Sequence, residues 1–210
     1  MSLNDPNFLA ILEDDPAAQA ALRDLMESEG RSTLCFDTAE QFLASTTGPH
    51  AACLIADVGM PGISGLELQS RLRQARCDIP IIFITARSDV PSVVRAMKNG
   101  ASDFFTKPFD VPELLAAVDR AVEASRRARR AALERADLEE RFRGLTPREQ
   151  EVLALLASGL LNKQIAAQLG IAEYTVQVHR GHIMRKMAAR SFAALVKMAD
   201  GVGLASEPSS

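Results

Sequence analysis

Five polar residues in the first half of the chain follow or end apolar, strand-like stretches, and their types suggest a common chemistry. They are Glu13, Asp14, Asp57, Thr85 and Lys107. Clustered carboxylates repel one another, and a hard divalent cation with oxygen ligands, Mg²⁺ rather than zinc, would relieve that repulsion. The hydroxyl and ammonium groups would neutralise a phosphoryl group on an aspartate, a known type of phosphoryl-accepting nucleophile. The set therefore indicates Mg²⁺-assisted phosphoryl transfer, although each residue alone could be an ordinary strand end or turn.

Repeated strand and helix patterns must position these residues. The buried, strand-like runs are Asn7–Leu12, Ser32–Phe36, Ala51–Ala56, Ile79–Ile84 and Asp103–Phe105, and a helix-like stretch follows each of them. Capping signals open several of these helices, for example Ser64 with Glu67. Parallel strands with helical crossovers predict a doubly wound α/β sheet, and such sheets bind ligands at the carboxyl ends of their strands. Asp57 then lies at the centre of the ligand-binding edge.

These residues and their spacing resemble the receiver domain of two-component response regulators over residues 5–124. The resemblance implies a flavodoxin-like five-stranded parallel sheet of order 2-1-3-4-5, with Asp57 accepting phosphate from a sensor histidine kinase. The implied Mg²⁺ ligands are Glu13, Asp14, Asp57 and the backbone carbonyl of Gly59. The residues implied to contact the phosphoryl group or to switch with it are Thr85, Lys107 and Phe104. Glu13 departs from the pattern, because aspartate is frequent there, and Gly59 offers no side chain.

A helical linker is expected over residues 125–143, which are rich in Arg, Ala and Glu and contain no Gly or Pro. The pattern favours a helix that continues from the last receiver helix after a break. The four arginines Arg126, Arg127, Arg129 and Arg130 could contact nucleic acid, but a solvated connector is the favoured interpretation. A weak dimer interface along this helix is an alternative that the sequence leaves open.

The second half carries a helix-start signature at Thr146-Pro147-Arg148-Glu149 and two helices, Asn162–Leu169 and Glu173–Met187, joined at Gly170. This spacing is typical of a helix-turn-helix. Together these segments resemble the LuxR-type helix-turn-helix over residues 144–204, an all-α domain of four helices whose third helix enters the major groove. By position, the residues facing bases are Gln177, Val178 and Gly181. Those near phosphates are Lys163, Thr175, Arg180 and Arg185. Ala172 departs from the pattern, since a serine cap is frequent there.

Charge and composition agree with this division. The residues through Val122 carry a net charge of −7 and those from Glu123 onward +4, which is a weak sign that only the second part meets nucleic acid. Cys35, Cys53 and Cys77 lack CxxC spacing and suit reduced thiols in the cytoplasm. No apolar run approaches the length of a membrane span, and the N-terminus shows no signal-peptide pattern.

The two halves together resemble the FixJ/NarL class of response regulators. That class implies a transcription factor controlled by phosphorylation, which binds double-stranded promoter DNA and forms a homodimer when phosphorylated. Two alternatives stay open. One is a Mg²⁺-dependent phosphatase or phosphotransferase with Asp57 as its nucleophile. The other is a constitutive DNA-binding protein whose receiver serves only as a dimer module.

Overall fold

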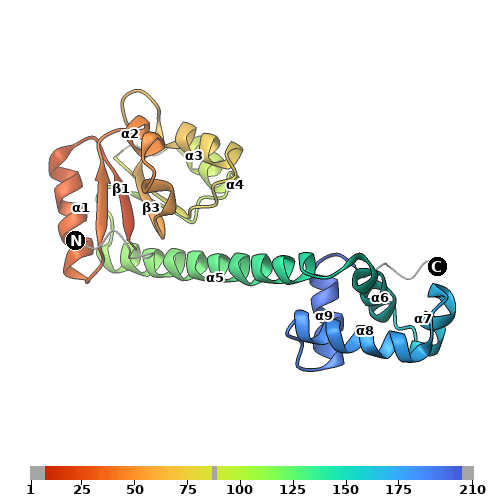
Figure 1. Ribbon diagram of the computed structural model, residues 1–210. Coiled ribbons are helices and arrows are strands. Elements are labelled where there is room, and N and C mark those ends of the chain that lie inside the picture. The colour runs from red at the N-terminus through yellow and green to blue at the C-terminus, as the bar shows by residue number, and fades with distance from the viewer. Residues whose placement is uncertain (1–7, 87–88, 205–210) are drawn as a thin grey trace. The chain divides into compact units, whose positions relative to one another are not determined.

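The computed structural model describes residues 8–86 and 89–204, and the chain divides into two compact units between Ala128 and Arg129. Strands and helices alternate along the first unit (Figure 1). Its strands are β1 Leu9–Leu12, β2 Thr33–Phe36, β3 Cys53–Asp57, β4 Ile81–Thr85 and β5 Asp103–Thr106. Its helices are α1 Pro16–Ser28, α2 Ala39–Ala44, α3 Gly65–Gln74 and α4 Val90–Lys98, with a short 3-10 helix η1 at Gly48–His50. The long helix α5, Val111–Arg143, begins in this unit.

The five strands form one parallel sheet of order β2-β1-β3-β4-β5, as predicted. The register decides which residues meet at the carboxyl edge. Leu12, the last residue of β1, pairs with Ala56 of β3. The residues that follow these two, Glu13 and Asp57, therefore lie side by side at the carboxyl edge. Asp57 pairs with Ile84, and Thr85 pairs with Thr106. The sheet therefore delivers the ends of β1, β3, β4 and β5 to one edge.

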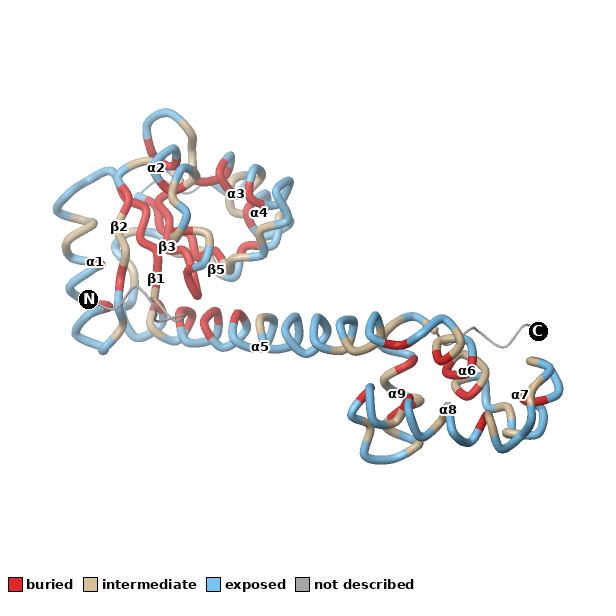
Figure 2. Tube along the Cα trace, in the orientation of Figure 1, coloured by how far each residue is buried: buried red, intermediate tan, exposed pale blue. Residues whose placement is uncertain are grey.

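Alternating side chains of the strands build two apolar cores, one on each face of the sheet. On β3, Leu54 and Ala56 face α2, α3 and α4, whereas Cys53 and Ile55 face α1 and α5. The three central strands β1, β3 and β4 are accordingly buried along their length, and helices cover both faces of the sheet (Figure 2). The edge strands β2 and β5 are only partly buried. A sheet covered on both faces explains why its strands read as continuous apolar runs.

Some predicted boundaries differ from the structure. Asn7, the predicted start of the first strand, lies outside the described residues. β4 runs from Ile81 to Thr85 rather than from Ile79 to Ile84, because Pro80 has no amide hydrogen and Thr85 still pairs with β5. Thr85 ends the strand, as predicted. The domain limits at residues 124 and 143 stay predictions.

The predicted break before residue 125 is wrong, because α5 continues as one helix of 33 residues. Its exposed arginines alternate with acidic residues one turn away, which relieves repulsion between the positive charges. The pairs at i,i+4 spacing are Glu123–Arg127, Arg130–Glu134, Arg135–Glu139 and Asp137–Arg141. Good helix formers and these pairs together sustain the helix through the region where the sequence suggested an interruption.

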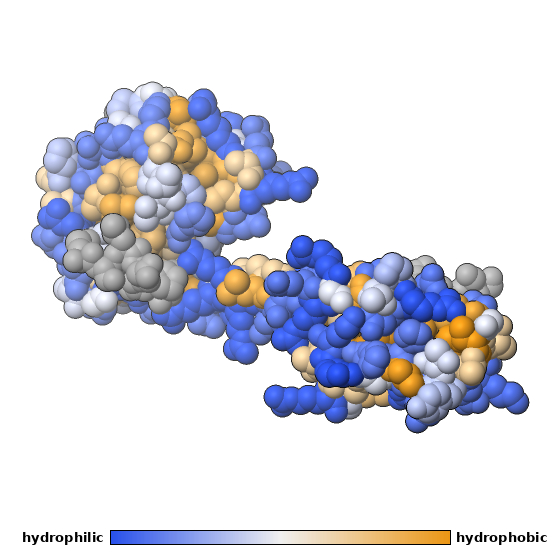
Figure 3. Space-filling model, in the orientation of Figure 1, coloured by the Kyte–Doolittle hydropathy of each residue, from blue (hydrophilic) through white to orange (hydrophobic). Residues whose placement is uncertain are grey.

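The second unit is helical. After the end of α5 it contains α6 Pro147–Ala157, α7 Asn162–Leu169, α8 Glu173–Lys186 and α9 Phe192–Gly201. Leu138 and Phe142 of α5 pack against a core whose buried members include Val152, Ile165 and Ile183. The last two turns of α5 thus belong to the packing of this unit. On the face drawn in Figure 3, hydrophobic patches interrupt a mainly hydrophilic surface on both units.

Cys35, Cys53 and Cys77 are free. Burial raises the pKa of Cys53 to about 12, so its thiol stays protonated at neutral pH and is a poor nucleophile. Within the described part of the chain, no helix combines the length and the apolar character needed to cross a bilayer.

Glu149 is a buried carboxylate that ties three segments of the second unit together. Its side chain accepts hydrogen bonds from the Thr146 amide at 2.8 Å and from Lys186 Nζ at 2.6 Å. Lys186 also donates to the carbonyl of Gly144. Burial raises the pKa of Glu149, but the hydrogen bonds from Lys186 and Thr146 outweigh that effect and bring the pKa to about 2.

Replacing Glu149 by Gln should therefore destabilise the second unit at neutral pH. Because the folded pKa lies below the ordinary value, the carboxylate stabilises the fold above pH 4.5 and that contribution disappears as the pH falls towards 2. We expect the variant to lose about 1–3 kcal/mol of unfolding free energy at pH 7, allowing for solvent screening at Lys186. The difference in stability between wild type and variant should narrow below pH 4.5. Calorimetric unfolding of the full chain between pH 7 and 3 measures this.

The matched control is Glu151→Gln, which removes the same charge from an exposed position of the same helix, where the side chain pairs with Arg148. An equal effect of the two substitutions at pH 7 would contradict the role of the buried carboxylate.

Candidate functional site

Three carboxylates converge at the carboxyl edge of the sheet. Glu13 and Asp14 directly follow β1, and Asp57 ends the adjacent strand β3. Each side chain offers one oxygen, and these oxygens all lie within 4.8 Å of one another. Glu13 and Asp57 are buried, whereas Asp14 is exposed. The structure thus brings together all three predicted acidic ligands, in a geometry that a small hard cation would fit.

Lys107 lies between two of these carboxylates. Its Nζ is 2.6 Å from Glu13 Oε2 and 3.1 Å from Asp57 Oδ2. Burial lowers the pKa of Lys107, but the hydrogen bonds to Glu13 and Asp57 outweigh it and raise that pKa above its ordinary value. Burial raises the pKa of Glu13, and the hydrogen bond from Lys107 only partly opposes this. The site therefore holds the positive charge of Lys107 beside the carboxyl group of Glu13, whose burial disfavours ionisation.

The residues after β3 shape the approach to Asp57. The amide of Gly59 donates a hydrogen bond of 2.8 Å to Asp57 Oδ1, which fixes the carboxylate. Gly59 is exposed, and a methyl group added there would meet only Asp57 Oδ1, at 3.6 Å. The backbone at this position therefore leaves one side of the Asp57 carboxylate open.

Thr85 and Phe104 lie on β4 and β5, next to this edge. Thr85 is buried, and its carbonyl accepts a hydrogen bond of 2.8 Å from the Lys107 amide. Phe104 is half-buried, with its ring centroid 6.2 Å from that of Phe83. Both residues were predicted to belong to the site. Thr85 directly follows Ile84, the partner of Asp57 on β4, whereas Phe104 pairs with Phe83, one position before that partner.

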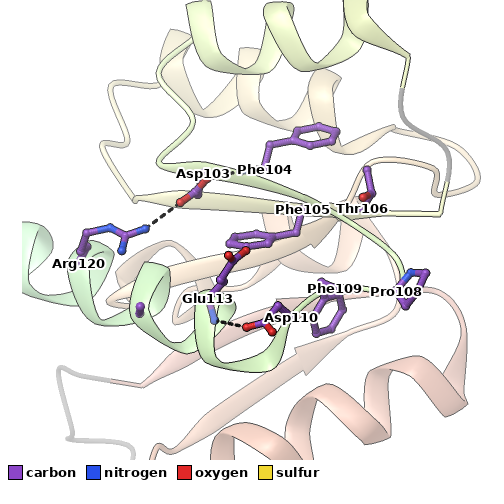
Figure 4. A pocket seen from close by; sticks show the side chains of 10 residues that line it. Asp103, Phe104, Phe105, Thr106, Pro108, Phe109, Asp110, Glu113 and Arg120 are labelled. Carbon is purple, nitrogen blue, oxygen red and sulfur yellow. Dashed lines mark hydrogen bonds and ion pairs between the residues drawn. The ribbon is translucent and has the colours of Figure 1, made fainter.

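A pocket of about 510 Å³ lies along β5 and the start of α5. In Figure 4, the Phe104 side chain points away from α5, and Phe105 points towards it. An ion pair of 3.0 Å between Asp103 and Arg120 closes one end of the pocket. Phe104 is therefore placed between the sheet edge and an outer surface.

Sequence reasoning missed Gly65, the first residue of α3. A methyl group added at Gly65 would lie 2.4 Å from the backbone carbonyl oxygen of Asp57 and 3.1 Å from the Phe83 ring. Only a residue without a side chain lets α3 begin this close to the end of β3. The one signal available was the glycine after the capping residue Ser64, and nothing local shows that it faces Asp57.

The second candidate site is the exposed side of α8. Val176, Ile183 and Met187 are buried against the core, whereas Gln177 and Val178 are exposed. The other exposed residues of the predicted DNA-facing set are Lys163, Gly181 and Arg185. The structure thus separates a core-facing side of this helix from an open side, at the residues that the sequence indicated.

Two details of α8 refine the prediction. Ala172 caps the helix without a side-chain hydrogen bond, yet the helix still begins at Glu173. Arg180 lies with its guanidinium carbon 4.2 Å from the centroid of the Phe192 ring. Stacking on that ring orients the Arg180 side chain, which, like Thr175, is half-buried.

Comparison with known proteins gives matches to both halves. The family described as response regulator receiver domain matches residues 9–119, and bacterial regulatory proteins of the luxR family match residues 143–199. Nodulation protein W of Bradyrhizobium diazoefficiens is 47% identical over 194 residues, covering 92% of this chain and 86% of that protein. The transcriptional regulatory protein FixJ of the same organism is 37% identical, covering 92% and 95%.

Solved structures agree. A low-resolution structure of the response regulator StyR is 44% identical with a TM-score of 0.84, covering 92% of this chain and 98% of that one. Full-length FixJ from B. japonicum is 36% identical with a TM-score of 0.57, covering 95% and 98%.

The close approach of α3 to β3 predicts the effect of Gly65→Ala. Because the added methyl group meets backbone atoms, α3 has to move, and we expect the first unit to lose about 1–3 kcal/mol of unfolding free energy. Thermal unfolding followed by circular dichroism measures the loss. Gln74→Ala, at the exposed far end of α3, is the control and should change stability by less than about 0.5 kcal/mol. Equal stability of Gly65→Ala and wild type would contradict the constraint.

Proposed function

The chain belongs to the response regulators that join a receiver domain to a LuxR-type DNA-binding domain, and from that membership we propose that phosphorylation of Asp57 controls its binding to promoter DNA. Its relatives are transcriptional regulators of two-component systems rather than classical enzymes. The observation that carries the proposal is the buried carboxylate of Asp57, held 3.1 Å from Lys107 Nζ among the three acids.

In the proposed reaction, a carboxylate oxygen of Asp57 attacks the phosphorus of a phosphohistidine on the sensor kinase. A new O–P bond forms while the P–N bond breaks, and the histidine nitrogen leaves with the electron pair. Lys107 is placed to offset the negative charge of the phosphoryl oxygens, since its ammonium already contacts Asp57. The Thr85 hydroxyl would bind a second phosphoryl oxygen. The Gly59 amide holds Asp57 in place.

Glu13, Asp14, Asp57 and the carbonyl of Gly59 would hold Mg²⁺, which when bound supplies positive charge opposite the transferred oxygens. The acidic cluster supports this assignment because it contains oxygen donors alone within 4.8 Å of one another. Glu13 Oε2 already accepts from Lys107. Glu13 would therefore act on the cation through a water, whereas exposed Asp14 would contact it directly.

The signal would leave the site through Thr85 and Phe104. As Thr85 turns towards the phosphoryl group, Phe104 would move inward beside Phe83 and change the surface formed by α4, β5 and α5. That surface already exposes Val90, Val94 and Met97 of α4. Exposed apolar side chains on one helix suit contact with a second copy, so we propose a homodimer of the phosphorylated chain. The partners of this proposal are a sensor histidine kinase and promoter DNA, and we propose that the protein meets them in the cytoplasm.

Asp57→Asn should abolish phosphorylation, because the amide cannot act as the accepting nucleophile. Wild-type protein incubated with acetyl phosphate and Mg²⁺ should gain the mass of one phosphoryl group, and chelation of Mg²⁺ should prevent it. Intact-mass spectrometry measures both. Asp24→Asn removes an exposed carboxylate from α1 and should behave as wild type. Undiminished labelling of Asp57→Asn would refute Asp57 as the acceptor. Unchanged DNA affinity of fully labelled wild type would instead favour a constitutive DNA-binding protein.

The proposed phosphate contacts predict a salt effect. Lys163→Ala or Arg185→Ala should weaken binding to every duplex and reduce the slope of log K against log salt by about one. Gln177→Ala should mainly relax base preference. Fluorescence anisotropy with labelled duplexes at several salt concentrations measures this. Arg73→Ala, an exposed cation on α3, is the control. A salt slope that is the same in all four variants and wild type would contradict the assignment.

A further inference from the structure

Tyr174 is an exposed aromatic residue in the first turn of α8 that the predicted DNA contacts leave out. The residue is 77% exposed. The first turn of a recognition helix is the part that meets base edges in the major groove. We propose that the Tyr174 ring packs against the 5-methyl group of a thymine, next to the base pairs that Gln177 and Val178 face. This inference rests on the proposed DNA-facing side of α8.

The position of Tyr174 on the helix supports the proposal. At about 100° per residue, Tyr174 lies within about 60° of Gln177, Val178, Gly181 and Arg185. The buried residues Val176 and Ile183 occupy the other side of the helix. Gln177, Val178, Gly181 and Arg185 thus form one row along the proposed DNA-facing side of α8. Tyr174 extends this row by one turn towards the helix N-terminus.

The character of the row suits an apolar contact in the groove. Tyr174 and Val178 are the large apolar side chains that α8 exposes. Single exposed apolar residues are common, but two that are one turn apart, on the side opposite the core, form a contact surface. At Gly181, an added methyl group would meet no atom within 4 Å, so the middle of the row is open to close approach. Apolar side chains read thymine by its methyl group, which no other base carries.

The composition provides a direct probe, because Tyr174 is the one tyrosine of the chain and there is no tryptophan. Tyrosine emission of the full-length protein therefore reports this side chain alone. On titration with duplex DNA of random sequence, we expect the emission to be quenched in step with binding, followed independently by anisotropy of a labelled duplex. Nitration of Tyr174 by tetranitromethane should slow at least fivefold in the bound state.

These measurements separate two kinds of failure. DNA binding with unchanged tyrosine emission and unchanged nitration would overturn the Tyr174 contact and leave the proposed function intact. Absence of DNA binding by the wild-type protein, with and without acetyl phosphate, would overturn both.

Selection from a pool of random duplexes tests the base preference. We expect Tyr174→Ala to lose a thymine preference at one base-pair position of each half-site and to bind the wild-type site roughly tenfold more weakly. Tyr174→Phe keeps the ring and should retain that preference. Leu133→Ala removes a similarly exposed side chain from α5 and should match wild type. The same selected sequence and affinity for Tyr174→Ala, or an equal loss in Tyr174→Phe, would overturn the ring contact.

Discussion

Electrostatic repulsion among carboxylates that the sheet forces together is the constraint on which the first unit depends. Parallel register places Glu13 beside Asp57, and both are buried, so neither charge can be relieved by water alone. Lys107 offsets part of this repulsion by contacting both side chains. With one lysine beside three carboxylates, the cluster keeps an excess of acidic groups. A bound divalent cation would offset that excess.

Local packing turns that charge cluster into a defined geometry. Gly65 lets α3 begin against the carbonyl of Asp57, and the Gly59 amide fixes the Asp57 carboxylate. Thr85 and Phe104 stand on the next two strands, and Phe104 borders both the core and an outer pocket. The second unit uses the same principle at Glu149, where a buried carboxylate is satisfied by one lysine and one helix cap. In both units, a buried acid fixes the spacing of segments that are distant in sequence.

Much of this was predictable from sequence, because strand ends, caps and turns carry local signals. The sheet order was predicted correctly, and the structure brings the three acids together and exposes Gln177 and Val178 of α8. The roles of these residues as metal ligands and DNA contacts stay predictions. The predicted break in α5 was wrong, because the helix continues and acidic residues one turn away pair with its arginines. The role of Gly65 and the pairing of Lys107 with Glu13 depend on how distant segments approach each other, and local sequence preferences contain no record of that. The proposed DNA contact of Tyr174 was not predicted, because an exposed aromatic residue resembles an ordinary surface residue until the whole exposed row of α8 is seen.

Gly181 has an evolutionary consequence. A glycine inside a helix costs about 1 kcal/mol relative to alanine, and here no neighbouring atom would obstruct a larger residue. Gene duplicates of this chain could therefore acquire new side chains at this position and gain helix stability at the same time. On the proposed DNA-facing side of α8, such single substitutions would change base preference and leave the proposed phosphorylation site in the other unit untouched.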